Sequence, residues 1–165
     1  MIKYLNKHQK IKSIVETALI VIVTASFFSV VLKPVMVNGS SMYPNLTNMS
    51  YGFTNVIGKE INGVDRFDIV CIDSIAANKK LVKRVIGLPG EIVEYIDNKL
   101  YINGVYIEEP FLNGTKTNDF YYKVPKGEYF CLGDNRTNSR DSRNYGSFKE
   151  REIFGKDLFV LIKGK

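Results

Sequence analysis

The stretch EIVEYIDNKLYINGVYI, residues 91–107, decides the fold class of this chain. Apolar residues alternate with polar ones in three short runs, which is the period of strands that bury one face. The pairs Asp97-Asn98 and Asn103-Gly104 separate the runs, and both are residue types that two-residue hairpin turns favour. Residues 92–107 are therefore predicted to form a β-meander.

The same kind of short alternating run continues on both sides of the meander, in RFDIVCI, KLVKRVIGL, DFYYKV, GEYFCL and DLFVLIK. Runs of this length and composition predict a mainly β fold of short antiparallel strands. No repeat, low-complexity tract or linker divides them. Residues 34–165 are thus expected to be one β-domain, from which residues 92–127 can project as a β-ribbon.

The N-terminal part of the chain has a different pattern. TALIVIVTASFFSVVL, residues 17–32, carries no charge. A bilayer core needs about 20 helical residues, so a span over residues 13–33 is predicted, preceded by a basic tail at residues 1–12. The protein is therefore expected in the cell membrane. Lysines before the span favour a cytoplasmic N-terminus, which places the β-domain on the extracytoplasmic side.

Two other interpretations of this segment stay open, a cleaved secretory signal and a buried helix of a soluble protein. An uncleaved single-pass anchor is favoured over a cleaved signal. The apolar run is longer than the core of a usual signal peptide, and no clear A-x-A cleavage site precedes Pro34.

The formal charge of +6 does not indicate a nucleic-acid partner. Four of these charges come from Lys3, Lys7, Lys10 and Lys12, before any acidic residue appears. The small remaining excess forms no basic stripe along the β-domain, so nucleic acid is excluded as a partner.

The two cysteines, Cys71 and Cys131, lie in apolar runs and lack the spacing of a zinc site. Both fit as core residues. An extracytoplasmic location would also permit a disulfide between them.

The only histidine, His8, limits the chemistry that the β-domain can perform. On the predicted topology it lies across the membrane from the domain, which excludes Ser-His-Asp and Cys-His mechanisms as well as histidine-containing zinc sites. No P-loop is present either, so neither a metal nor a cofactor is expected. A hydrolase built on this chain needs Lys, Asp or Glu as its base.

Three segments could supply such a site. GSSMYPNL, residues 39–46, places two serines shortly after the membrane segment, and KLVKRVIGL places Lys83 between apolar neighbours in a strand. Burial lowers the pKa of a lysine, and a neutral amine can deprotonate a serine. A serine in a turn and a lysine in a strand are each more often structural. The third segment is GDNRTNSRDSRNYG, residues 133–146. It holds so many polar and charged side chains that they are expected to pair with one another, and a charge-assisted hydrogen bond between Asp141 and an arginine is expected to hold the loop in place.

In this order after one N-terminal anchor, GSSMYPNL, RFDIVCI, KRVIGLPGE and GDNRTNSRDSRNYG closely resemble the sequence boxes of bacterial type I signal peptidases, in particular the short enzymes of Gram-positive bacteria. The resemblance implies a signal-peptidase-like β-domain and a serine endopeptidase that removes signal peptides from secreted preproteins. It also implies that Ser41 is the nucleophile, that Lys83 is the general base, and that Ser139 hydrogen-bonds and orients the lysine amine. Asp141 and Arg143 match the residues that brace the site.

Three positions depart from the family pattern. Gly39 stands where Gram-negative members carry a serine that donates to the oxyanion, so a backbone amide or an ordered water is expected to replace that donor. Asn45 stands where threonine is usual, and Phe67 stands where glycine is usual. Neither of these two changes removes a catalytic group.

The resemblance also implies the substrate class and its contacts. The partners are preproteins with small residues at positions −3 and −1 before the cleaved bond, and membrane lipid. The peptide is expected to pair as an added strand over shallow apolar pockets. By motif position these are lined by Val35, Val37, Met42, Leu81 and Val82, for which ordinary core packing is an equal alternative.

Two other functions are compatible with part of the pattern. One is a self-cleaving serine/lysine peptidase, although such repressors need a DNA-binding segment where this chain has its membrane helix. The other is a non-catalytic, membrane-tethered β-domain that binds peptides, which leaves Ser41, Lys83 and Ser139 without a purpose.

Overall fold

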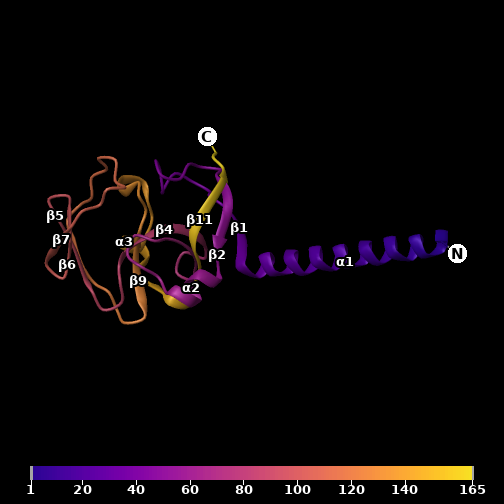
Figure 1. The fold of residues 1–165 in the computed structure, drawn as a ribbon. Helices are drawn as coiled ribbons and strands as arrows, with labels where there is room; N and C mark the ends of the chain where they lie inside the picture. The colour runs from indigo at the N-terminus through magenta and orange to yellow at the C-terminus, as the bar shows by residue number, and fades with distance from the viewer. Residues whose placement is uncertain (1, 165) are drawn as a thin grey trace.

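The computed structural model describes residues 2–164, with side chains from residue 9 onward. One long helix leads into a β-rich domain (Figure 1). The elements are α1 Ile2–Val31, β1 Leu32–Met36, β2 Tyr51–Asn55, α2 Ile57–Asn62, β3 Ile69–Ser74, β4 Lys79–Gly87, β5 Ile92–Ile96, β6 Lys99–Ile102, β7 Val105–Ile107, β8 Phe120–Lys123, β9 Glu128–Leu132, the 3₁₀ turn η1 Arg136–Asn138, α3 Ser142–Tyr145, β10 Phe148–Lys149, the 3₁₀ turn η2 Glu150–Glu152, and β11 Ile153–Ile162.

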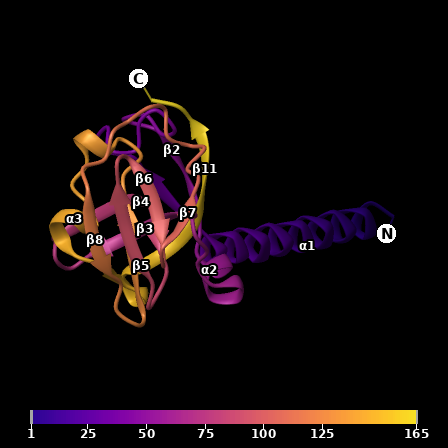
Figure 2. The same ribbon diagram turned by 90° about the vertical axis from the view of Figure 1, so that its left-hand side faces the viewer.

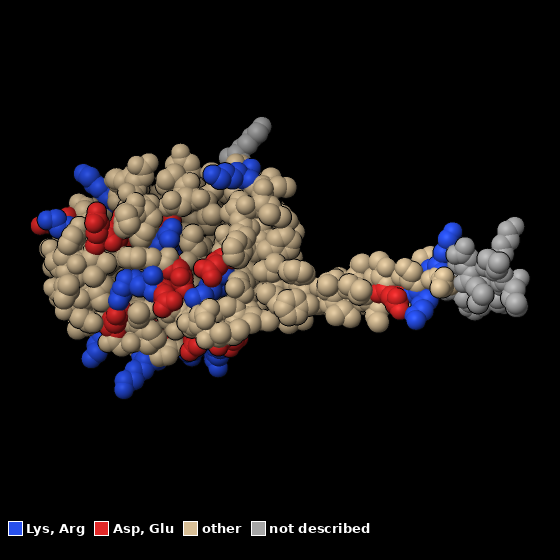
Figure 3. Space-filling model, in the orientation of Figure 1, with Lys and Arg blue, Asp and Glu red and all other residues tan. Residues whose placement is uncertain are grey.

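The helix α1 extends away from the domain, and its segment Gln9–Val31 is long and apolar enough to cross a membrane, with a mean hydropathy of 2.3 and no part buried. At 1.5 Å per residue these 23 residues cover about 34 Å, which matches a hydrocarbon core. Figure 3 shows charged side chains only toward the N-terminal end of the helix, while the part next to the domain carries none.

The helix has other limits than the predicted span over residues 13–33. The helix continues without a break through most of the predicted basic tail, and it ends at Val31, two residues before the predicted limit. Lys33 instead lies in β1, opposite Thr54 of β2. The following Pro34 explains the early end, because a proline disfavours helical geometry at the residue before it.

The main sheet has seven strands in the order β1-β2-β11-β3-β4-β9-β10, and its pairings are antiparallel. The second sheet has four strands in the order β7-β6-β5-β8. It covers one side of the main sheet, as Figure 2 shows by looking onto β5, β6 and β7. The mainly β antiparallel fold predicted from the sequence is confirmed, with one N-terminal apolar helix.

The meander that decided the fold class forms as predicted. β5, β6 and β7 are joined at Asp97-Asn98 and at Asn103-Gly104, and all four turn residues have positive φ between 51° and 80°. Positive φ at both central residues defines the turn type that fits the twist of a hairpin.

The apolar faces of the two sheets pack against each other. Val93, Tyr95 and Leu100 of the second sheet meet Phe130 and Leu132 of β9 in one cluster. A second cluster lies around β3, β4 and β9, and a third, smaller one lies under residues 37–46. The two cysteines are free and buried in this core, so the disulfide that the sequence permitted is not formed.

Candidate active site

Ser41 lies in a compact turn between β1 and β2. The turn is closed by hydrogen bonds from Tyr43 N to Ser40 O, 3.1 Å, and from Leu46 N to Met42 O, 2.9 Å. Met42 and Leu46 are buried in the third apolar cluster, so the turn is anchored from below while Ser41 stays partly accessible. Val37, which precedes Ser41, is buried in the same cluster, so the chain is anchored on both sides of the Ser41 hydroxyl group.

Lys83 comes from the middle of β4, where it pairs with Val70 of β3. Its side chain is only 2% exposed. The Nζ atom lies 2.6 Å from Ser41 Oγ and 3.0 Å from Val82 O. Two segments 42 residues apart in the chain therefore bring an amine and a hydroxyl into hydrogen-bond contact.

The environment of Lys83 disfavours its charged form. Burial lowers the pKa of this amine to about 8, although the nearby Asp141 carboxylate opposes the shift. A lysine with such a pKa is partly neutral near neutral pH and can accept a proton. The pair can therefore transfer the Ser41 proton to Lys83.

Asp141 holds together the loop that follows β9. Its carboxylate accepts hydrogen bonds from Gly133 N, 3.0 Å, from Arg143 N, 3.2 Å, and from the Arg143 guanidinium at 2.9 and 2.8 Å. Burial alone would raise the pKa of Asp141, but Arg143 and the Gly133 N–H hold it below its usual value. The carboxylate stays charged and pins the loop beside the pair.

Ser139 lies in this loop, but the hydrogen bond to Lys83 that the sequence analysis expected is not formed. By distance and angle its buried Oγ atom has no hydrogen-bond partner among the described residues, although it lies near enough to the Asp141 carboxylate to help hold the pKa of that group down. Lys83 Nζ is instead occupied by Ser41 and Val82. Ser139 Oγ and Ser41 O both pack against Gly133 so closely that a Cβ atom there would overlap both.

The position of Gly39 bears on the second oxyanion donor. Gly39 has φ +101°, and its N–H donates to Asn48 Oδ1 at 2.7 Å, so this amide is already occupied. Within the part of the chain that the structure describes, the Ser41 N–H has no acceptor. One backbone donor beside the nucleophile is therefore available to an oxyanion.

The five apolar residues predicted to line substrate pockets divide between core and surface. Val37 and Met42 are buried together, with Val82 partly buried against them. Leu81 belongs to the larger cluster around β3, β4 and β9, while Val35 is half-buried in β1. Core packing thus accounts for Val37, Met42 and Leu81 in this structure.

Sequence reasoning missed the contacts that join the Ser41 turn to the loop after β9. Asn135 N donates to Ser41 O at 3.0 Å, its side chain donates to Ser40 O at 3.1 Å, and Asn138 Nδ2 donates to Ser40 Oγ at 3.0 Å. The only signal was the density of polar residues in this loop. The hydrogen-bond partners depend on how the two loops lie relative to each other, and this arrangement cannot be predicted from the sequence.

His8 belongs to α1, and its side chain lies outside the described residues. Among the described residues no group of three or more His, Cys, Asp or Glu could hold a metal ion.

Comparison with known proteins gives consistent matches. The family model for signal peptidase, peptidase S26, matches residues 9–162. Signal peptidase I S of Bacillus subtilis strain 168 is 40% identical over 169 residues, covering 92% of this chain and 91% of its own. A signal peptidase I of Bacillus amyloliquefaciens is 44% identical over 142 residues, covering 79% of this chain and 74% of its own.

A solved structure is also similar. The crystal structure of a signal peptidase I from Enterococcus faecalis V583 has 41% sequence identity and a TM-score of 0.53. The match covers 56% of this chain and 95% of that one.

Proposed function

The chain belongs to the signal peptidase family, peptidase S26, as a membrane-anchored serine peptidase that removes signal peptides, and we propose that Ser41 is its nucleophile and Lys83 its general base. The observation that carries the assignment is the 2.6 Å contact between Ser41 Oγ and the buried Lys83 Nζ. A hydroxyl is a weak nucleophile until a neighbouring base takes its proton, and Lys83 is the amine within reach.

The reaction proceeds through an acyl-enzyme. Lys83 takes the proton as Ser41 Oγ attacks the carbonyl carbon of the cleaved bond, and the carbonyl oxygen becomes an oxyanion. The Ser41 N–H, which has no acceptor among the described residues, donates to it. The Lys83 ammonium then returns the proton to the leaving amine of the mature protein. Water, deprotonated by Lys83, hydrolyses the ester and restores both groups.

Ser139 and Asp141 stabilise the charged ammonium form of Lys83. A buried hydroxyl without a partner is costly, and Ser139 Oγ can accept a hydrogen bond from the ammonium that forms during the reaction. Asp141 favours the same charged state through its negative charge, and Arg143 holds the Asp141 carboxylate in place. Both contributions lower the barrier to proton transfer without touching the substrate.

The substrates are secreted preproteins with small residues at −3 and −1. The turn before Ser41 and the strand that carries Lys83 offer backbone groups and half-buried apolar side chains, such as Val35 and Val82, to an extended peptide. Small side chains suit this surface because most of its apolar residues are already packed into the core.

The membrane topology is N-terminus in and catalytic domain out, with lipid around α1. Lys10 and Lys12 lie in the first turn of the apolar segment Gln9–Val31, at its N-terminal end, in line with the tendency of positive residues to stay in the cytoplasm. Only nine residues separate Val31 from Ser41, so the anchor keeps the nucleophile close to the membrane surface where a signal peptide ends.

The test is cleavage of a preprotein by the detergent-solubilised full chain. Ser41→Ala removes the attacking atom, so we expect no detectable cleavage, whereas the matched change Ser40→Ala next to it keeps appreciable activity. Circular dichroism shows whether both variants stay folded. Full activity of Ser41→Ala would refute the assignment, and an inactive wild type would favour a peptide-binding domain without catalysis.

A further inference from the structure

Asn45 lies four residues after Ser41 in the same turn. Although the residue is exposed, its Nδ2 atom has two acceptors from distant parts of the chain. It lies 2.9 Å from Phe111 O and 2.8 Å from Asp134 Oδ2. An amide nitrogen has two hydrogens to donate, so both are used.

The two acceptors are fixed by one residue, Arg84, which follows Lys83 in β4. Its guanidinium donates to Asp134 Oδ1 and Oδ2 at 2.8 and 2.7 Å, and to Phe67 O at 2.9 Å. The same guanidinium stacks on the Phe111 ring at 4.0 Å. Phe67 packs against that ring with centroids 4.9 Å apart.

Phe111 lies in the connection between β7 and β8, and a second contact holds this connection in place. Glu109 forms a buried ion pair with Arg136 of the loop after β9, with 2.5 Å between oxygen and nitrogen. The side chains are 6% and 0% exposed, and Arg136 also contacts Tyr95 of the second sheet. The segment is therefore pinned at two residues, 109 and 111, and offers Asn45 a fixed acceptor.

Besides their direct hydrogen bond, Ser41 and Lys83 are linked by this series of contacts. It runs from the Ser41 turn through Asn45 to Phe111 O and Asp134, then to Arg84 and its neighbour Lys83. A charge-assisted bidentate pair and a stacked guanidinium are both rigid geometries. An error of about 1 Å in the position of a reacting group can cost on the order of a hundredfold in rate.

We propose that Asn45 is a positioning residue, which fixes the Ser41 turn against Lys83 by joining it to the second sheet at Phe111 and to the Arg84–Asp134 pair. The second sheet then contributes to catalysis through its β7–β8 connection, although it supplies no catalytic residue. The proposal rests on the proposed roles of Ser41 and Lys83.

The test compares Asn45→Leu and Asn45→Thr with a control, Asn113→Leu, in the full-length chain with a preprotein substrate. Asn113 is exposed on the same connection and its side chain has no hydrogen bond among the described residues. Leucine keeps the size of Asn45 but donates nothing. Threonine has one donor, so it can restore at most one of the two contacts.

We expect Asn45→Leu to lower kcat on the order of tenfold with KM within about twofold of wild type, because positioning acts on the reacting hydroxyl and not on peptide binding. Asn45→Thr is expected to lie between Asn45→Leu and wild type, and Asn113→Leu to match wild type. Rates are measured well below the thermal midpoint of the least stable variant, so that loss of folded protein does not enter.

A wild-type kcat in Asn45→Leu, or a loss confined to KM, would overturn the proposal. Ser41→Ala in the same assay separates this outcome from failure of the proposed function. If Ser41→Ala is inactive while Asn45→Leu is normal, only the positioning role is wrong. If Ser41→Ala remains active, the assignment of the site itself is wrong.

Discussion

Lys83, the proposed general base, should weaken the fold. The pKa of its amine falls from 10.5 to about 8 because burial penalises the charged form. Below pH 8 the lysine is charged in both the folded and the unfolded chain, so folding carries the full penalty, up to about 3 kcal/mol. The penalty shrinks between pH 8 and 10.5, where the folded chain has lost a proton that the unfolded chain still holds.

Replacing Lys83 with methionine should stabilise the protein because it removes this penalty. It should also abolish cleavage because it removes the proposed base. We expect the free energy of unfolding of Lys83→Met to exceed that of wild type by up to about 3 kcal/mol at pH 7, and by less than about 1 kcal/mol at pH 10. Urea unfolding at the two pH values measures this, with the exposed Lys79→Met as the control. Equal stability of Lys83→Met and Lys79→Met at pH 7 would contradict the desolvation argument.

Single residues differ in how far the sequence revealed them. The apolar neighbours of Lys83 predicted its burial, because strand alternation is local. Phe67 could not be anticipated in the same way. It adopts φ +74°, which favours glycine, and it is tolerated where its ring packs on Phe111 and its carbonyl accepts from Arg84.

At the level of elements, hairpins were predictable where turn chemistry and alternation agreed. Asn103-Gly104 is the strongest such signal, and Gly104 has φ +80° with open space where a Cβ atom would lie. Gly104→Ala therefore tests backbone strain alone.

We expect Gly104→Ala to lower the free energy of unfolding by about 1 kcal/mol, the usual cost of placing a side chain in the left-handed region. Urea unfolding is again the measurement, and Lys116→Ala, an exposed change near the same sheet, is the control. The cleavage rate should stay unchanged because Gly104 makes no side-chain contact and the turn supplies no group to the site. No loss of stability would mean that the turn is not formed as described.

The strands that the sequence analysis missed are β1, β2 and β10. β1 follows the helix directly and contains Lys33 and Pro34, so it was assigned partly to the membrane span. β2 contains Gly52, which a strand pattern disfavours but which the close approach of Phe159 O requires. β10 has two residues and gives no periodic signal. In each case a long-range pairing overrides the local pattern.

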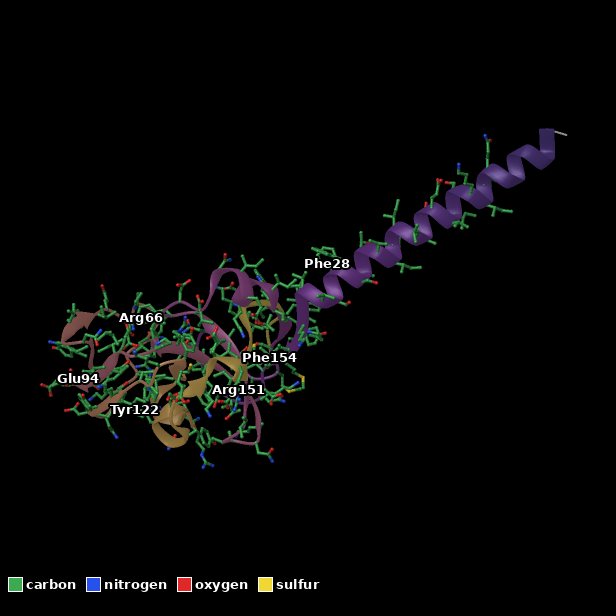
Figure 4. The ribbon with its side chains drawn as sticks, turned by 90° about the horizontal axis from the view of Figure 1, so that it is seen from below. Phe28, Arg66, Glu94, Tyr122, Arg151 and Phe154 are labelled. Atoms are coloured by element: carbon green, nitrogen blue, oxygen red, sulfur yellow. The ribbon has the colours of Figure 1, made fainter. Side chains whose placement is uncertain are left out.

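On the scale of the whole molecule, the anchor and the second sheet lie at opposite ends. Figure 4 places Phe154 beside the base of α1 and Glu94 of β5 at the far end. Helix α1 leads directly into β1, and the turn that carries Ser41 follows β1, so the proposed nucleophile lies close to the anchor along the chain. The order of these parts along the chain could be predicted, but their arrangement depends on contacts such as Glu109–Arg136 that join distant segments.

The proposed topology can be tested in intact cells stripped of their wall. Added protease should remove an epitope tag at the C-terminus and spare one at the N-terminus, because the membrane shields only the cytoplasmic side. Lysed cells serve as the control, in which both tags are digested. The reverse pattern in intact cells would place the domain in the cytoplasm.

The proposed reaction requires a neutral Lys83 amine that accepts the Ser41 proton. The direct measurement is the single-turnover cleavage rate of a bound preprotein between pH 6 and pH 10, which excludes product release from the observed rate. With the pKa of Lys83 at about 8, the rate should rise about tenfold from pH 7 to pH 9 and then level off. A rate that is constant over this range, or that rises only near the ordinary lysine pKa of 10.5, would contradict the account.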